Sequence, residues 1–525
     1  MIRVRDIALS PGHSDRALLQ STARTLRVRP EDIASLQIFR RSLDARKKPE
    51  LRWVYTVDVT LQNGEDRLLK KNKNPKITKE EPFVYHIPEK TSESRPVVVG
   101  FGPGGMFAAL VLAEAGLRPI VLERGEPVPE RREKVEAFWN GGPLDPDSNV
   151  QFGEGGAGTF SDGKLNTGTK NPRSRWILEQ FVRFGAGEEI LYDAKPHVGT
   201  DVLFRVVQNL RKEIISLGGE VRFGAKLLNI TENAGTVSGV LCERNGEQQE
   251  LPCRDVVLAI GHSARDTFRR LYAQGIPMEP KPFSMGVRIE HPQALIDEAQ
   301  YGGPRPAGVP PADYKLSVHL PDGSSAYTFC MCPGGYVVAA ASQEGAVVTN
   351  GMSYSGRSGK YANSALLVTL KPENFPDQSA LGGMIWQEEI EKKAFRLGGE
   401  TYHAPAQTVG DFLTHRPSEK LEGTYRPGLT PCDLHELYPA VITDTLEQAI
   451  PALDGHLKGF ASPEAVLTAP ETRSSSPVRI LRDASCQSSL SGLYPCGEGA
   501  GYAGGIMSAA ADGMICAEKI IEKLP

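Results

Sequence analysis

The stretch PVVVGFGPGGMFAALVLAEAGLRPIVLE, residues 96–123, decides the fold. It opens with an apolar run typical of a short buried strand, and a helical pattern follows the spacing G-x-G-x-x-G at Gly100, Gly102 and Gly105. A second apolar strand pattern ends at Glu123. A glycine-rich turn between strand and helix, with an acidic residue after the next strand, is the fingerprint of a dinucleotide-binding βαβ unit.

Each residue of this turn has an expected task. Gly100 permits the tight turn, Gly102 lets the backbone approach a pyrophosphate, and Gly105 allows the helix to pack closely on the strand. With Pro103 and Gly104 in its first turn, the helix would direct free N–H groups and its positive dipole end toward the phosphates.

Glu123 narrows the choice of dinucleotide. It stands 23 residues after Gly100, where a carboxylate can accept hydrogen bonds from ribose hydroxyls. An acid at this place disfavours a 2′-phosphate, so we expect FAD or NAD rather than NADP. Arg124, the next residue, is included among the expected cofactor contacts.

Two further glycine-rich loops favour FAD. Residues 151–164, QFGEGGAGTFSDGK, would lie beside the ribityl chain and the flavin, the longer reactive end of FAD. Residues 492–513, GLYPCGEGAGYAGGIMSAAADG, place Glu498 after a strand, where it can bind a ribityl hydroxyl. The helix that follows would direct its positive end at the flavin pyrimidine edge and stabilise negative charge there. The contacts expected from the two loops are Gly156, Gly158, Thr159, Ser161, Asp162, Lys164, Gly497, Glu498, Gly504, Gly505 and Ile506.

Three strand patterns, at residues 220–230, 236–244 and 254–260, fit a β-meander inserted before Gly261. In that arrangement the backbone near Leu227 would face the adenine, and Gly261 would lie beside the FAD. The expected fold class is therefore α/β, with a Rossmann-like FAD-binding domain.

The expected FAD-binding domain is discontinuous and consists of residues 91–282 and 441–525. An α+β cap, or substrate domain, would be inserted between them as residues 283–440. Residues 1–90 form a small basic α/β domain, with strands expected at 2–9, 33–44 and 51–61 and a turn-rich stretch at 70–79.

Glycine is concentrated where these loops lie. The chain has 54 glycines in 525 residues, and 14 of them fall within residues 100–105, 153–163 and 497–505. Because glycine permits close backbone approach, we expect these three loops to converge on one cofactor.

Composition excludes several classes of protein. No apolar run approaches the ~18 residues of a membrane span, and the early polar residues of MIRVRD argue against a signal peptide. Eight cysteines are no disulfide framework, so we expect a reduced, cytoplasmic protein. The net charge of −4 argues against DNA binding. Residues 1–95 nevertheless carry a net charge of +7, which fits either a solvated basic surface or contact with RNA or an acidic partner.

Three long segments carry a family resemblance: residues 150–167, 329–368 (FCMCPGGYVVAAASQEGAVVTNGMSYSGRSGKYANSALLV) and 493–513. They resemble a family of bacterial and plastid FAD-dependent dehydrogenases. The FAD segments are similar to the glutathione-reductase-type fold, in its branch with one FAD domain and a substrate cap. The resemblance covers most of the chain and implies FAD and an oxidoreductase role, without naming a substrate.

The spacing of residues in the sequence does not show which residue would accept the proton in such a reaction. The candidates are His262, His403, His415, Arg416 and Arg473, and His415–Arg416 or Arg473 could clamp an anion or carbonyl. An ordinary surface or core role is the alternative for each. Since the glycines of residues 153–158 lack a preceding βα context, we expect no separate NAD(P)H domain, and electrons would come from the substrate, a transient NAD(P)H or a protein donor.

Cysteine placement leaves two readings. Cys330 and Cys332 could be a redox pair beside the flavin, or two strand cysteines on one face. No second cysteine pair completes a zinc set, so no metal is expected. We expect the Cys496 side chain to pack among its neighbours, and the alternative for it is a redox role.

We therefore expect a dehydrogenase that binds FAD non-covalently and transfers two electrons, as hydride at flavin N5, from a small-molecule substrate. The first alternative is a flavoprotein acting on RNA or another macromolecule through residues 1–90. The second is a non-catalytic FAD-binding protein.

Overall fold

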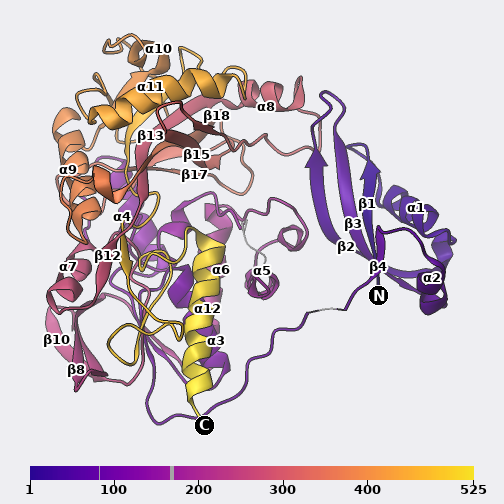
Figure 1. The fold of residues 1–525 in the computed structure, drawn as a ribbon, viewed down its shortest axis with the longest axis horizontal. Helices are drawn as coiled ribbons and strands as arrows, with labels where there is room; N and C mark the ends of the chain where they lie inside the picture. The colour runs from indigo at the N-terminus through magenta and orange to yellow at the C-terminus, as the bar shows by residue number, and fades with distance from the viewer. Residues whose placement is uncertain (82, 166–170) are drawn as a thin grey trace.

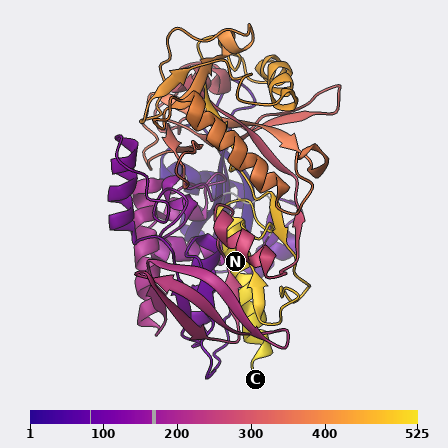
Figure 2. The same ribbon diagram turned by 90° about the vertical axis from the view of Figure 1, so that its left-hand side faces the viewer.

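The computed structural model of this chain describes residues 1–81, 83–165 and 171–525. Residues 166 and 167, which end the first of the three family segments, lie outside the described residues. Three parts are visible in Figure 1: a small N-terminal unit at the right, a body that carries the C-terminal helix, and a cap above the body. Figure 2 shows the cap standing directly over the body.

The N-terminal unit is an antiparallel sheet in the order β2-β3-β1-β4. Its strands are β1 (Ile2–Leu9), β2 (Ile33–Asp44), β3 (Arg52–Leu61) and β4 (Ile77–Lys79), with helices α1 (Asp15–Leu26) and α2 (Glu65–Lys71). The three strands expected from sequence are confirmed, whereas α2 and β4 lie around the stretch expected to be turn-rich. The unit contacts the body through an ion pair of 2.7 Å between Arg41 and Asp193.

The body is built on a parallel sheet in the order β23-β11-β5-β6-β7. These strands are β5 (Val97–Val99), β6 (Ile120–Leu122), β7 (Glu220–Arg222), β11 (Val256–Leu258) and β23 (Leu493–Pro495). Helices α3 (Pro103–Glu114) and α12 (Ile506–Lys523) pack against each other beside the sheet (Figure 1). The other helices of the body are α4 (Val128–Trp139), α5 (Arg173–Arg183), α6 (Thr200–Ser216) and α7 (Arg265–Ala273). The mixed α/β class expected from sequence is confirmed.

The β-meander differs from the sequence expectation in its strands. It consists of β8 (Ala225–Asn233), β9 (Thr236–Arg244) and β10 (Glu247–Pro252). The expected strand 220–230 divides in two, because Gly224 adopts a φ of +62° that ends β7. The expected third strand, 254–260, belongs to the parallel sheet as β11. β10 carried no sequence signal because it is polar and exposed along most of its length.

The cap contains a seven-stranded sheet in the order β14-β15-β18-β13-β21-β19-β20. Its strands are β13 (Phe283–Pro292), β14 (Ser317–His319), β15 (Ser325–Cys332), β18 (Tyr361–Leu370), β19 (Ala404–Thr408), β20 (Leu429–Pro431) and β21 (Val466–Glu471). A separate pair is formed by β16 (Tyr336–Ala339) and β17 (Thr349–Met352). The cap helices are α8 (Gln293–Tyr301), α9 (Gly382–Leu397), α10 (Val409–Phe412) and α11 (Ala440–Asp454).

The cap also continues further along the chain than expected. β21 lies between β13 and β19 and is buried along its whole length, and α11 packs on the same sheet. The chain leaves the cap at β22 (Val478–Ile480), which pairs with β12 (Met278–Pro280) where the cap begins. The expected boundary at residue 441 is therefore wrong, because strand pairing holds residues up to Glu471 in the cap sheet.

Two expectations from composition can be compared with the structure. All eight cysteines are free thiols, as expected of a chain without a disulfide framework. Among the described residues, no helix combines the length and the hydrophobicity that a membrane crossing requires.

Candidate functional site

A cavity of about 600 Å³ lies between the body and the cap. This volume is within the range of small-molecule and cofactor sites. Its wall includes residues of all three glycine-rich loops and, from the cap, residues of β15 and those around Arg473. Of the twenty expected cofactor contacts, the wall includes Gly100, Gly102, Pro103, Gly104, Glu123, Arg124, Gly156, Gly158, Ser161, Lys164, Leu227, Gly261, Gly497, Glu498, Gly504, Gly505 and Ile506.

The first glycine-rich turn cannot accept larger residues at two places. A Cβ on Gly100, whose φ is +95°, would stand 2.3 Å from the carbonyl oxygen of Ala259. A Cβ on Gly105 would stand 1.9 Å from the carbonyl oxygen of Gly100. Gly105 therefore lies behind the cavity wall, where it allows helix and strand to pack closely. Gly102 caps α3 without a side-chain hydrogen bond, so the first-turn amides of α3 remain available at the cavity.

Glu123 is occupied largely by its own chain. Its carboxylate accepts hydrogen bonds from the backbone N–H groups of Phe101 (2.8 Å), Gly125 (2.9 Å) and Gly153 (2.9 Å). Since a carboxylate offers about four acceptor positions, one remains for a ribose hydroxyl. The side chain thus joins the first glycine-rich turn to the second, a task that its spacing did not predict.

Two residues of the second loop do not face the cavity as expected. The Thr159 hydroxyl is buried and donates to the carbonyl oxygen of Glu154. Asp162 is fully buried and pairs with Arg357 and with Lys164, whose Nζ is 3.1 Å away. Burial alone would raise the pKa of Asp162, but these two cations hold it well below its usual range. These two cations compensate the charge of Asp162. Its carboxylate therefore lies behind the wall and holds Lys164 in place.

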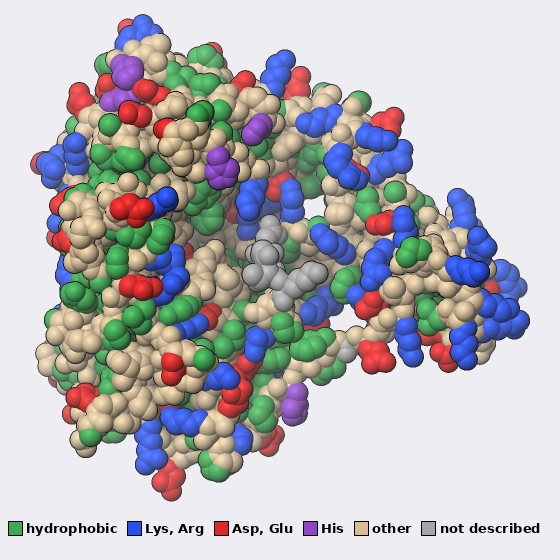
Figure 3. Space-filling view, viewed as in Figure 1, with side chains coloured by type: hydrophobic (Ala, Val, Ile, Leu, Met, Phe, Trp, Pro, Cys, Tyr) green, Lys and Arg blue, Asp and Glu red, His purple; other side chains and the backbone are tan. Residues whose placement is uncertain are grey.

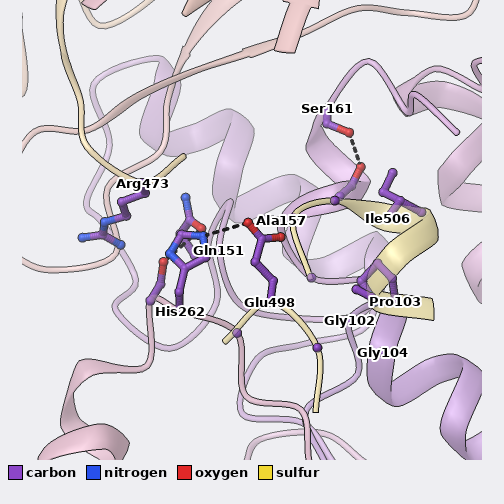
Figure 4. Close-up of a pocket in the computed structure, with 18 of the residues that line it drawn as sticks. Gly102, Pro103, Gly104, Gln151, Ala157, Ser161, His262, Arg473, Glu498 and Ile506 are labelled. Atoms are coloured by element: carbon purple, nitrogen blue, oxygen red, sulfur yellow. Dashed lines mark hydrogen bonds and ion pairs between the residues drawn. The ribbon is translucent and has the colours of Figure 1, made fainter. Parts of the chain in front are cut away.

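The third loop brings Glu498 and the N-terminus of α12 to the cavity. Figure 4 shows Glu498 and His262 pointing toward each other, with 3.8 Å between Glu498 Oε1 and His262 Nε2. Burial raises the pKa of Glu498 to about 7, although Lys281 opposes the shift. The carboxyl group can therefore accept or donate a proton near neutral pH. Gly505 caps α12 without a side-chain hydrogen bond.

His262 and Arg473 are the two catalytic candidates that the structure brings to the cavity (Figure 4). Burial, together with the charges of Arg473 and Arg265, lowers the pKa of His262 to about 3, so the ring is neutral at pH 7. Within the described residues, its Nδ1 has no hydrogen-bond partner. Arg473 and Arg265 both pair with the buried Glu391, at 2.7 Å each. Two guanidinium groups against one carboxylate leave a net positive charge beside the cavity.

Four other candidates lie elsewhere. His415 and Arg416 follow α10 on the outer part of the cap, and His403 packs against Gly428. Cys332 is fully buried behind the wall, whereas Cys330 forms part of it. A bulge in β15 gives Cys330 a φ of +43° and separates the orientations of the two cysteines.

The environment of Cys330 favours its ionised form. The Cys332 side chain holds the pKa of Cys330 below its usual range against the effect of burial, and Arg288 and Lys164 contribute in the same direction. The Cys332 thiol itself donates to the carbonyl oxygen of Cys330 over 3.2 Å. Of the two cysteines that could form a redox pair, only Cys330 therefore lies on the cavity wall.

Sequence reasoning missed the contribution of the cap and of one glutamine. Gln151 opens the second glycine-rich loop and accepts a hydrogen bond from the Ser263 hydroxyl at 3.1 Å. Its place within the loop could have identified it. The cap residues on the wall are Asp313, Tyr314, Lys315, Thr328, Phe329, Met331, Asn350, Glu471 and Ser474. They come from separate strands and loops, so no spacing in the sequence joins them.

Comparison with known proteins places these features in a family. Residues 282–474 match the model described as "FAD-dependent protein, C-terminal domain-like", and residues 1–60 match a model described as a domain of unknown function. An uncharacterized protein of Clostridium beijerinckii is 48% identical over 536 residues, which cover 99% of this chain and 99% of that protein.

Solved structures are more distant. The quinol fumarate reductase of E. coli matches at 12% identity and a TM-score of 0.35, over 82% of this chain and 70% of that one. A geranylgeranyl bacteriochlorophyll reductase-like protein of Thermoplasma acidophilum matches at 14% identity and a TM-score of 0.35, over 82% of this chain and 79% of that one. The glycerol-3-phosphate dehydrogenase of Bacillus halodurans, solved with FAD, matches at 12% identity and a TM-score of 0.35, over 83% of this chain and 64% of that one.

Proposed function

The chain belongs to the family of FAD-dependent proteins defined by this C-terminal domain, and on that premise we propose that it binds FAD non-covalently and acts as a dehydrogenase on a small-molecule substrate. The observation that carries the proposal is one cavity walled by three glycine-rich loops, the first and last of which lie some 400 residues apart in sequence. Two helix N-termini, those of α3 and α12, reach the same cavity without side-chain caps.

The residues of the cavity fit the proposed cofactor. Gly261, Gly504 and Gly505 line the wall and have no atom within 4 Å of the place where a Cβ would stand. Their backbone is thus open to close approach by a ligand. In the proposed arrangement the N-terminus of α3 holds the pyrophosphate, the backbone at Leu227 faces the adenine, and Glu498 binds the ribityl chain.

The bound cofactor would supply two-electron chemistry at flavin N5. The N-terminus of α12 would stabilise negative charge on the flavin pyrimidine edge. His262, kept neutral by burial, offers at Nδ1 either a lone pair that accepts a substrate proton or an N–H that donates a hydrogen bond to the substrate. The net positive charge of Arg265, Arg473 and Glu391 favours a substrate with a carboxylate or a polarised carbonyl.

The test of the proposal begins with the purified protein. We expect a yellow protein that releases FAD on denaturation, and stopped-flow bleaching of the flavin by a member of a metabolite panel that includes NADH and NADPH. A colourless protein that takes up neither FAD nor FMN would overturn the proposal. A flavin that binds but is reduced by no compound would favour the non-catalytic alternative.

One observation favours action on RNA or an acidic partner as a second candidate. Figure 3 shows Lys and Arg side chains gathered over the N-terminal unit, and residues 1–95 carry a net charge of +7 in a chain whose net charge is −4. Lys70, Lys71 and Lys73 are exposed at one end of it. If this surface binds RNA, replacing the three lysines by glutamine should weaken RNA retention and reduce its salt dependence, without changing flavin content.

A further inference from the structure

A cluster of two histidines and two carboxylates lies in the cap, and none of the four lines the cavity. His415 follows α10, His435 and Asp433 precede α11, and Glu447 lies within α11 (Figure 1). The Nε2 atoms of His415 and His435 stand 2.8 and 2.7 Å from the same oxygen, Glu447 Oε1. Nδ1 of His435 stands 2.6 Å from Asp433 Oδ1.

Ring stacking holds this geometry in place. Phe412 stacks on His435 with a centroid distance of 4.7 Å, and His415 stacks on His435 with a centroid distance of 4.1 Å. His415 adopts a φ of +54°, a left-handed conformation that costs a non-glycine residue about 1 kcal/mol or more. His415 therefore keeps a disfavoured backbone conformation while its ring is directed toward Glu447.

The hydrogen-bonding capacity of these groups calls for added positive charge, supplied either by a proton on a ring or by a bound cation. A carboxylate only accepts hydrogen bonds, and a neutral imidazole has one N–H and one lone pair. His435 has a carboxylate oxygen at each ring nitrogen, so in its neutral form one lone pair faces an anion. Among the described residues, neither Asp433 nor Glu447 pairs with a lysine or arginine. Two carboxylates and two neutral rings carry a charge of −2, which a divalent cation would balance.

We propose that His415, His435 and Glu447 bind a divalent transition-metal ion of the zinc type. Their ligand atoms lie within 4.8 Å of one another, and two imidazoles with one carboxylate suit zinc better than the oxygen-seeking Mg²⁺ or Ca²⁺. Asp433 would accept the Nδ1–H of His435 and so direct its Nε2 lone pair at the metal, the usual carboxylate–histidine–metal arrangement. Water would complete the coordination.

Such a metal would join three separate segments of the cap. It would tie the turn after α10 and the loop before α11 to the second half of α11, which packs on β15 and β18. Because the ion would bind the folded cap in preference to the unfolded chain, it would stabilise the folded form. This site is independent of the proposed flavin chemistry, since neither needs a residue of the other.

The experiment uses the full chain, freed of metal with EDTA and then titrated with Zn²⁺ against a chromophoric chelator. We expect one high-affinity zinc ion per chain and a rise in the melting temperature. His415→Ala and Glu447→Gln should each weaken zinc binding by more than tenfold and abolish that rise. His415 is 58% exposed in its side chain, so its replacement leaves the fold intact, as circular dichroism would verify.

The matched control is His456→Ala, which removes an exposed imidazole just beyond the end of α11 and should leave zinc binding unchanged. Asp433→Asn should keep the stoichiometry and lower the affinity by about 10- to 100-fold, as expected of a positioning residue. Equal zinc affinity in the unaltered chain, His415→Ala and Glu447→Gln would overturn the proposal. So would the absence of stoichiometric zinc binding by the unaltered chain.

Discussion

The carboxylate of Glu123 accepts the backbone N–H of Gly153 over 2.9 Å, and this bond joins the end of β6 to the second glycine-rich loop. The same carboxylate holds the turn after β5 through the N–H of Phe101. The two loops proposed to enclose the cofactor are therefore positioned by one buried side chain, whose exposed fraction is 4%.

We predict that Glu123→Gln destabilises the fold and weakens FAD binding together. An amide keeps one acceptor oxygen and turns an NH₂ group toward backbone donors, so at least one buried N–H loses its partner. The free energy of unfolding should fall by about 1–3 kcal/mol, measured by urea denaturation. Glu130→Gln, at an exposed position of α4, is the control and should change neither quantity. Unaltered stability in Glu123→Gln would show that the bonds contribute nothing.

The glycine at position 504 allows cofactor binding to be separated from folding. Its Cβ position is open and its φ is not positive, so Gly504→Val should leave the unfolding free energy unchanged within about 0.5 kcal/mol. A valine at the entrance to α12 should obstruct the proposed flavin and lower FAD affinity at least tenfold. Gly303→Val is matched, since Gly303 is equally open but lies outside the wall. Equal FAD affinity in both variants would contradict the placement of the flavin at α12.

The part of the site that sequence predicts is the part encoded by local spacing. Gly100, Gly102 and Gly104 occur within five residues, and α12 begins at Ile506, directly after Gly504 and Gly505, where a helix is expected. Helix periodicity and glycine spacing are local, and the sequence shows them directly.

The rest depends on contacts between distant segments. Glu471 lies on β21 of the seven-stranded sheet and Asn350 lies on β17 of the separate pair, and both reach the cavity. No local pattern in the sequence reveals that these two strands meet there. Strict alternation would place Cys330 and Cys332 on one face, but the bulge between Phe329 and Cys332 shifts the register and leaves only Cys330 on the wall.

The raised pKa of Glu498 predicts a pH dependence of stability. Between pH 4.5 and about 7 the folded chain holds a proton on Glu498 that the unfolded chain has released. The stabilisation is therefore fully present at low pH and is lost as the pH rises through about 7. His262, with a pKa of about 3, has the opposite effect on stability below pH 6.5. The effect of Glu498 must therefore be isolated as the difference in stability between the unaltered chain and a Glu498 variant that keeps His262.

Glu498→Gln should remove this loss, which is on the order of 3 kcal/mol between pH 4.5 and 7.5. The measurement is urea denaturation of flavin-free protein across that range, with the Glu498→Gln curve subtracted from that of the unaltered chain. The difference should decline as the pH rises. A flat difference curve would mean that the carboxyl group titrates normally in the folded chain.

Cys330 should be the most reactive of the eight thiols. Because its pKa is lowered, Cys330 has a larger thiolate fraction at neutral pH than an ordinary cysteine, and it lies on the cavity wall where a small alkylating reagent can reach it. Iodoacetamide should label Cys330 first, with a rate whose pH inflection lies below that of an ordinary thiol, as read by mass spectrometry. Cys332→Ala removes the thiol that lowers the pKa of Cys330 and should move the inflection up, toward the ordinary value. Cys242→Ala is the control, because that buried thiol lies in the β-meander and should not affect the profile. If the inflection is the same in Cys332→Ala as in the unaltered chain, then Arg288 and Lys164, rather than the neighbouring thiol, hold the charge.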